Sequence, residues 1–351
     1  MYNKAAICKA LKQTPVFAAV TPSDLKILNS KGLTHKHILI GDTGWLLRIP
    51  QGNQLGLDSA AYLQQQKACY QTAQASGHTP GFLDILPPSP ALSEGALVIQ
   101  AIKGRKPQLP QDWKAIAGSL AALHAIDINQ NNGLEVATYP FAGQSFLLNT
   151  IFSDAYARAQ LNPATRALID AELEDINDLI EQLKDDKSLT LSLIGGDSHP
   201  ANFMIDDNGK AWLVDLEYLA YDMAHIDLAD AGLTITTRLE PDMTPCQEKT
   251  ARQKFHDDWK KAAAPHLTDK ADSLISLAER TVRARTLLWL TYWQTDARAE
   301  KAGKIPQQTF DNWDNMARAY LDPYNLKQLL AHGLDPALIS HTPQASPKAQ
   351  P

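Results

Sequence analysis

The chain has 351 residues, of which 44% are hydrophobic and 21% are charged. This length allows two domains or one bilobal enzyme, and the composition is ordinary for a globular protein. The 33 basic and 39 acidic residues give a net charge of −6, which argues against a nucleic-acid-binding protein because such proteins need a basic face.

Cysteine usage and the apolar runs bear on the compartment. The three cysteines, Cys8, Cys69 and Cys246, form neither a disulfide framework nor a metal-binding spacing, so a reducing compartment fits. The N-terminal residues lack the pattern of a signal peptide. No apolar run reaches the roughly 18 residues of a membrane-spanning helix. We therefore expect a cytoplasmic protein with no membrane span.

Hydrophobic periodicity and turn residues predict strands early in the chain and helices late. The early part is expected to contain a helical segment over 1–29 with a break at Thr14-Pro15 and an N-cap at Thr21, strands over 38–40 and 45–50, a helix over 58–76, and a strand over 96–102. The later part is expected to contain helices over 111–126, 145–185 (two helices, the second from Asn162 to Lys184), 244–264, 269–299 and 308–331, and a disordered tail over 340–351.

The segment from Leu193 to Asp230 carries the most informative polar residues. Asp197 follows an apolar run and two glycines, and Asn202 comes five residues later. Residues 206–209 form a turn signal between two strand-like runs, and Asp215 ends the second run. A hairpin would bring Asn202 and Asp215 together, with Asp197 at the entrance. The set provides a proton acceptor and two oxygen ligands for Mg²⁺, as phosphoryl transfer requires. The alternative is that these acids only cap turns.

The pattern D-x-x-x-x-N, hairpin, D-x-E-Y, then an aspartate twelve residues after Asp215 (Asp227) resembles the choline/ethanolamine kinase branch of the aminoglycoside phosphotransferase and choline kinase superfamily. The resemblance implies an α+β, protein-kinase-like bilobal fold, with an antiparallel-sheet lobe over 1–103 and a mostly helical lobe over 104–339. It implies that Asp197 is the catalytic base and that Asn202 and Asp215 bind Mg²⁺. Where the family has histidine, this chain has Gly195.

The resemblance also implies nucleotide-binding residues in the first lobe. Leu46-Leu47-Arg48 matches the family's L-L-R strand, so Arg48 is expected to contact the phosphates of ATP. Thr34 lies in the loop that covers the phosphates in the family, and Gln100 lies at the hinge next to adenine. The family's helix glutamate is replaced by Gln66. From the residues alone, Arg48 and Gln100 could also be an exposed strand arginine and a solvated linker residue.

The acceptor site is expected in the second lobe. Choline kinases use a W-x-x-W pair as a cation–π wall, and this chain has Trp289, Tyr292 and Trp293; a tryptophan pair at this spacing could equally be core. Glu217 and Tyr218 are further candidate acceptor contacts. We expect an ATP- and Mg²⁺-dependent kinase for a small, cationic alcohol such as choline or ethanolamine. The alternatives are an aminoglycoside, thiamine or other small-molecule kinase, and a catalytically weak nucleotide-binding relative. The acceptor, the choice of ATP over GTP and the oligomeric state stay open.

Overall fold

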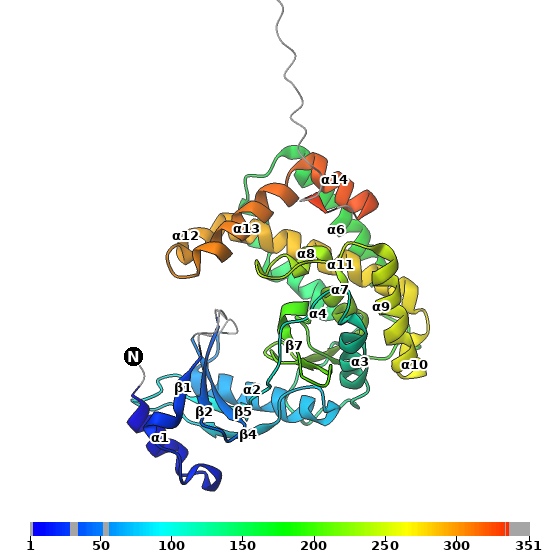
Figure 1. Ribbon diagram of the computed structural model, residues 1–351. Coiled ribbons are helices and arrows are strands. Elements are labelled where there is room, and N and C mark those ends of the chain that lie inside the picture. Colours follow the sequence, from blue (N-terminus) through cyan, green and yellow to red (C-terminus); the bar gives the residue numbers. More distant parts are fainter. Residues whose placement is uncertain (1–2, 29–33, 52–55, 334, 337–351) are drawn as a thin grey trace, which may run out of the picture.

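The computed structural model describes residues 3–28, 34–51, 56–333 and 335–336. An antiparallel sheet and the helices beside it form one lobe, and a larger, mostly helical lobe follows (Figure 1). The boundary predicted at residue 103 falls between the last strand of the sheet and the next helix. The predicted tail over 340–351 lies outside the described residues.

The sheet has the strand order β1-β2-β3-β5-β4, and all its neighbouring strands are antiparallel. Its strands are β1 (Leu25–Ile27), β2 (His35–Ile40), β3 (Trp45–Pro50), β4 (Phe82–Leu86) and β5 (Ala96–Gln100). Side chains alternate between the two faces of a strand. In β3, Leu47 packs with α1 (Lys4–Leu11) on one face, and Leu46 packs with the core around α2 (Ser59–Ala73) on the other.

The expected helix over 1–29 is wrong in its second half. α1 ends at Leu11, two short 3₁₀ turns follow at Pro15–Phe17 and Pro22–Asp24, and β1 then pairs with β2. Thr21 occupies the N-cap position of the second turn, and its backbone N–H and hydroxyl donate to Asp24 Oδ2 at 2.8 and 2.7 Å. The run after Asp24 is too short to show a strand period, so pairing with β2 decides its structure.

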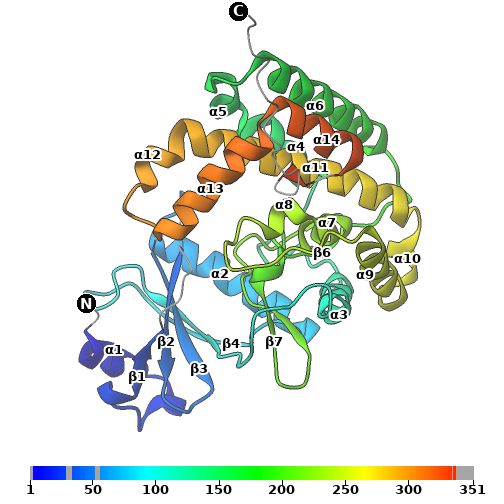
Figure 2. The ribbon, with the colours of Figure 1, turned by 45° about the horizontal axis from the view of Figure 1, so that its top comes forward.

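Helix α2 lies between the sheet and the helical lobe (Figures 1 and 2). Asp58 caps its first turn by accepting from Ala61 N at 2.8 Å. A 3₁₀ turn extends it to Ser76, and the chain then reverses at Gly77, whose φ of +69° favours glycine. Its inner side chains, including Leu63 and Tyr70, join one core with residues of both lobes. The sequence prediction for this helix is confirmed.

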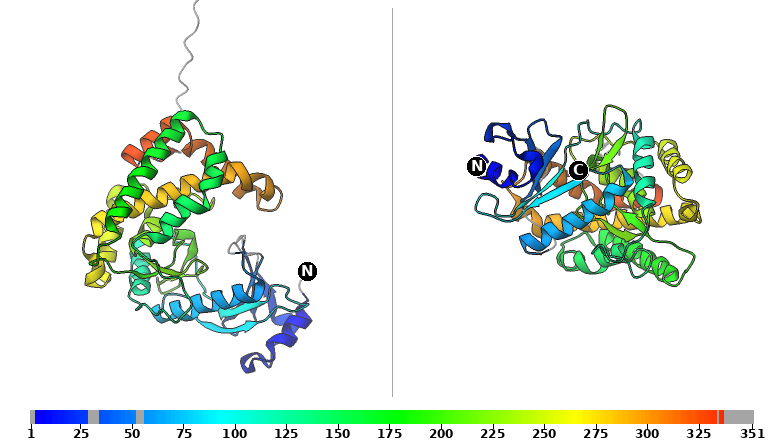
Figure 3. Two further views of the ribbon diagram at one scale, coloured as in Figure 1. Left: turned by 180° about the vertical axis from the view of Figure 1, so that it is seen from behind. Right: turned by 90° about the horizontal axis from the view of Figure 1, so that it is seen from below.

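The helical lobe is built around the long helix α11 (Ala271–Tyr292), which packs against α7 (His225–Gly232) and other helices. The remaining helices are α3 (Trp113–His124), α4 (Ala142–Phe146), α5 (Ser153–Arg158), α6 (Pro163–Leu183), α8 (Thr234–Thr237), α9 (Lys249–Ala262), α10 (Pro265–Thr268), α12 (Arg298–Lys301), α13 (Gln307–Tyr320) and α14 (Pro323–His332). The end formed by α12 and α13 reaches back towards the sheet lobe (Figures 1 and 3).

Two short antiparallel pairs carry the segment that the sequence singled out. β6 (Ser192–Ile194) pairs with β9 (Ala220–Asp222), and β7 (Phe203–Ile205) pairs with β8 (Ala211–Leu213). The β7–β8 turn is closed by Gly209 N donating to Asp206 O at 2.9 Å. The predicted hairpin is therefore present.

Candidate active site

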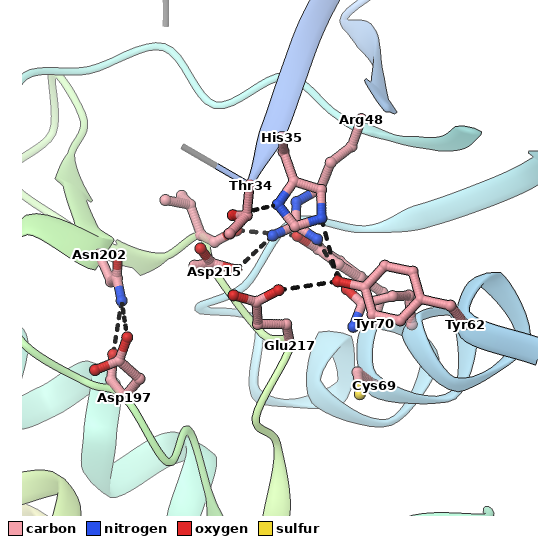
Figure 4. Close-up of polar contacts among 12 residues, drawn as sticks. Thr34, His35, Arg48, Tyr62, Cys69, Tyr70, Asp197, Asn202, Asp215 and Glu217 are labelled. Atoms are coloured by element: carbon pink, nitrogen blue, oxygen red, sulfur yellow. Dashed lines mark hydrogen bonds and ion pairs between the residues drawn. The ribbon is translucent and has the colours of Figure 1, made fainter. Parts of the chain in front are cut away.

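The β7–β8 hairpin places Asn202 immediately before one strand and Asp215 shortly after the other. Val214 N donates to Asn202 O at 2.9 Å, which holds the two ends of the hairpin together. The side-chain amide of Asn202 points the other way, and its Nδ2 donates to Asp197 O at 2.7 Å and to Asp197 Oδ2 at 3.3 Å. The structure therefore gathers Asp197, Asn202 and Asp215 at one place, as the sequence spacing predicts (Figure 4).

The carboxylate of Asp197 remains accessible. Its side chain is 40% exposed, and His199 Nε2 lies 3.6 Å from Asp197 Oδ2. This separation is too long for a strong hydrogen bond. An exposed carboxylate held at its backbone and at one oxygen is suited to accept a hydrogen bond from an incoming hydroxyl.

The loop that carries Asp197 is fixed by its backbone to the buried carboxylate of Asp227. Gly195 N and Gly196 N donate to Asp227 at 2.7 and 3.0 Å, and His124 Nε2 lies 3.1 Å from the same carboxylate. Trp259 Nε1 donates to His124 Nδ1 at 3.0 Å, which places the histidine proton on Nε2. The loop is therefore anchored without a side chain at position 195.

The loop is closely packed at positions 195 and 196. A Cβ at Gly195 would lie 2.3 Å from Ser198 Oγ and 2.9 Å from Leu213 Cδ2. At Gly196, a Cβ would lie 2.5 Å from Tyr218 O, and the φ of +77° favours glycine. Both glycines allow the loop to pack directly against neighbouring backbone and side chains.

Arg48 on β3 is buried, so the alternative of an exposed strand arginine is wrong. Its Nη1 donates to Gln66 Oε1 on α2 at 2.8 Å, and its Nη2 forms an ion pair with Asp215 Oδ1. The guanidinium also lies 5.7 Å from the centre of the Tyr70 ring. The arginine thus links the sheet, α2 and the end of the β7–β8 hairpin.

Glu217 lies next to this ion pair and is held from α2. Tyr62 Oη donates to Glu217 Oε2 at 2.9 Å, and Gln65 Nε2 donates to Glu217 O at 3.3 Å. Burial, reinforced by the negative charge of Asp215, raises the pKa of Glu217 to about 7. The carboxyl of Glu217 therefore faces α2.

The other two residues expected to bind the nucleotide are Thr34, which directly precedes β2, and Gln100, which ends β5. Thr34 Oγ1 lies 2.9 Å from His35 Nδ1, and His35 in turn lies 3.4 Å from Tyr62 Oη. Gln100 ends β5, and its Oε1 accepts from Gly81 N at 3.2 Å. Gln100 is thus not a solvated linker residue, and it is not part of the cluster around Arg48. The rest of the expected phosphate loop, residues 30–33, lies outside the described residues.

The tryptophan pair at the end of α11 forms an aromatic cluster with α13; Trp289 lies on α11, and Trp293 begins the π-helical turn Trp293–Ala297 that follows it. The rings of Trp289 and Trp293 are stacked 6.3 Å apart, and Trp313 meets both edge-on at 4.9 and 5.0 Å. Trp293 is fully buried and donates from Nε1 to Asp314 Oδ1 at 2.9 Å, whereas Trp289 is only partly buried. Tyr292 contacts the ring of Phe152 at 6.2 Å. Trp293 is therefore closed to a ligand, whereas part of Trp289 stays accessible.

The donor set near Asp197 fits Mg²⁺ held together with phosphates rather than by protein ligands alone. Throughout the described residues, no group of three or more His, Cys, Asp or Glu side chains is placed to hold a metal ion. The side chain of Asp215 is 30% exposed, and its Oδ1 forms an ion pair with the guanidinium of Arg48. Asp215 therefore already binds a cationic group in this structure. Asn202 directs its Nδ2 to Asp197, which leaves Oδ1 as its ligand atom. Mg²⁺ keeps several waters and needs few protein oxygens.

Two residues of the site were missed by sequence reasoning. Tyr62 holds Glu217, and His199 lies beside Asp197. Tyr62, Gln66 and Tyr70 repeat every four residues, which places them on one helix face. This spacing was a usable signal, because polar and aromatic side chains on an inward helix face need hydrogen-bond partners.

The comparisons with known proteins agree with this geometry. The family model described as phosphotransferase enzyme family (APH) matches residues 28–265. Among solved structures, an ethanolamine kinase from Plasmodium vivax is 12% identical, with 92% of this chain and 89% of that chain covered and a TM-score of 0.60. A choline/ethanolamine kinase family protein from Mesorhizobium loti is 18% identical, with 91% and 99% covered and a TM-score of 0.55.

A third similar structure is a thermostable mutant of an aminoglycoside phosphotransferase in a ternary complex with AMP-PNP and hygromycin B. It is 17% identical, with 89% of this chain and 98% of that chain covered and a TM-score of 0.54. A search of curated proteins finds no match. Within the described part of the chain, no helix is both long and apolar enough to cross a membrane.

Together, the sheet lobe, the helical lobe and these likenesses define a protein-kinase-like fold of the α+β class, which confirms the fold prediction. The chain belongs to the phosphotransferase enzyme family, whose model covers more than half of its length. It is an enzyme of the small-molecule kinase class.

Proposed function

We propose that this kinase transfers the γ-phosphoryl group of ATP to the hydroxyl of a small, cationic alcohol of the choline or ethanolamine type. The observation that carries the proposal is the convergence of Asp197, Asn202 and Asp215, with Arg48 bound to Asp215. The use of ATP is supported by the AMP-PNP in the similar aminoglycoside phosphotransferase structure.

In this proposal, Asp197 is the catalytic base. It accepts the proton of the acceptor hydroxyl while the oxygen attacks the γ-phosphorus, and the bond to the β–γ bridging oxygen breaks to leave ADP. Asn202 and Asp215 would hold Mg²⁺, which would neutralise charge on the phosphate oxygens. Arg48 shares its guanidinium between Asp215 and the phosphates. Thr34 and Gln100 line the nucleotide from the two ends of the sheet.

The acceptor is proposed to lie between Asp197 and the aromatic cluster of α11 and α13. Trp289 offers a partly exposed ring, and Trp313 packs edge-on against it. A quaternary or primary ammonium group gains roughly 0.5–2 kcal/mol from each such ring. Tyr218 and Tyr292 are further proposed contacts, whereas Trp293 supports Trp289 from the core.

The proposal is tested by measuring Mg²⁺-dependent ATP consumption with choline, ethanolamine, thiamine, sugars and aminoglycosides as acceptors. We expect turnover with a small amino alcohol and formation of its phosphate ester. Turnover with only an aminoglycoside or thiamine would instead support another small-molecule kinase of this family.

A second candidate function is a catalytically weak relative that binds the nucleotide. Gln66, which contacts Arg48 in place of a glutamate, favours it. Nucleotide binding without transfer to any acceptor would support this candidate.

A further inference from the structure

One face of α2 makes three polar contacts with the residues around Arg48 and Asp215. Tyr62, Gln66 and Tyr70 are buried on this face, one helical turn apart. Tyr62 donates to Glu217, Gln66 accepts from Arg48, and Tyr70 Oη donates to Val214 O at 3.0 Å. The helix is thus attached both to β3 and to the segment that follows β8.

These contacts close a ring. Starting from Arg48, one hydrogen bond leads to Gln66, one turn of α2 leads to Tyr62, and a second hydrogen bond leads to Glu217. Two residues along the chain, Asp215 returns to Arg48 through the ion pair (Figure 4). Each member of the ring is fixed by two others, so α2 cannot shift without breaking a buried polar contact.

The negative charges of this ring all lie outside α2. α2 contains no acidic residue, so the carboxylates that face Arg48 both come from the large lobe. Gln66 supplies a neutral oxygen, and its own Nε2 is bound to Gln65 Oε1 at 2.8 Å. The only link between α2 and a carboxylate of this ring is the Tyr62 hydroxyl. A hydrogen bond to a charged acceptor is stronger than one between neutral groups.

We propose that Tyr62 is a positioning residue: its hydrogen bond to Glu217 holds α2 on the metal-binding segment and takes over the role of the ion pair that Gln66 cannot form with Arg48. This inference rests on the proposed function, in which Arg48 and Asp215 bind the nucleotide with its Mg²⁺. The phenol acts through Glu217 and Arg48. It therefore sets nucleotide affinity and the order of α2, and it leaves the proton transfer to Asp197.

The test compares Tyr62→Phe with Tyr156→Phe. The first change removes the hydroxyl that binds Glu217 at 2.9 Å and that also lies 3.4 Å from His35 Nε2. The second removes a hydroxyl that donates to Asp170 Oδ1 at 2.6 Å between α5 and α6 in the helical lobe. Two readouts need no acceptor: the dissociation constant for Mg²⁺-ATP, and amide hydrogen exchange along α2 without nucleotide. A third variant, Tyr62→Phe with Gln66→Glu, offers Arg48 a carboxylate from α2.

We expect Tyr62→Phe to raise the dissociation constant about tenfold and to speed exchange in α2, consistent with the loss of one buried hydrogen bond. Tyr156→Phe leaves both unchanged, and the added Gln66→Glu restores most of the affinity. Unchanged exchange and affinity in Tyr62→Phe, or no recovery with Gln66→Glu, would overturn the inference. If the wild type binds no nucleotide, the proposed function fails, and the exchange measurement still decides the role of Tyr62.

Discussion

Replacing Asp227 by asparagine tests how the loop of Asp197 is held. The carboxylate is fully buried and receives three donors, from Gly195 N, Gly196 N and His124 Nε2. An asparagine has one acceptor oxygen and one NH₂ group. Placed with its oxygen towards Gly195 and His124, it turns the NH₂ group towards the N–H of Gly196.

The expected loss of stability follows from this comparison of hydrogen-bond donors and acceptors. One hydrogen bond to a charged acceptor disappears, which contributes about 1.5–3 kcal/mol, and two others become neutral and weaker. A buried NH₂ group is also left facing another donor, while the loss of a buried charge offsets part of the total. We expect the free energy of unfolding to fall by about 3 kcal/mol.

The assay is urea unfolding followed by tryptophan fluorescence, together with amide exchange of the loop around Asp197. Asp207→Asn is the matched control, because it makes the same chemical change at an exposed turn residue. We expect the control to stay within about 0.5 kcal/mol of the wild type. An Asp227→Asn protein with wild-type stability and unchanged exchange at Gly195 and Gly196 would refute the anchoring role.

Three further predictions concern other parts of the molecule. Burial lowers the pKa of His225 to about 3, so the unfolded chain binds the proton first, and His225 alone should lower stability by about 1.4 kcal/mol per pH unit as pH drops from about 6.5 towards 3. Burial also lowers the pKa values of His35, His37 and His256, so in urea titrations His225→Phe should reduce the total slope by this amount, and an unchanged slope would assign it to the other histidines. Arg48→Lys cannot contact Gln66 and Asp215 in the same fork geometry, so the KM for ATP should rise about tenfold, and an unchanged KM would contradict the role of the guanidinium. Trp293→Ala should destabilise the fold by about 3–5 kcal/mol, whereas Trp289→Ala should mainly raise the KM for the acceptor, and the reverse pattern would contradict the proposed wall.

The sequence predicted the parts of the site whose spacing is local. Asp197, Asn202 and Asp215 lie within one hairpin, so a turn at 206–209 is enough to bring them together. Arg48 was identified because Leu46-Leu47-Arg48 resembles the family's L-L-R strand. The sequence did not indicate that its guanidinium is buried. The helix over 58–76 was also predicted, because its cap and its terminating glycine are explicit in the chain.

Contacts between residues distant in sequence could not be predicted in the same way. Tyr62 and Glu217 are separated by 155 residues, and no local pattern shows that a helix face will meet a segment of the other lobe. For Trp289 and Trp293, four-residue spacing placed both on one helix face, but only the packing of α13 decides that Trp293 is buried and Trp289 is not. β1 was mistaken for helix because its three residues depend on pairing with β2.

The most direct test of the central claim is the effect of Asp197→Asn on phosphoryl transfer and on nucleotide binding, measured in the same preparation. The acceptor is the one that gives turnover with the wild type. We expect kcat to fall at least about a hundredfold, as for loss of a general base, with the dissociation constant of Mg²⁺-ATP within about threefold of the wild type because Arg48 and Asp215 are untouched. An Asp197→Asn enzyme that retains wild-type kcat would contradict the assignment of Asp197 as the base.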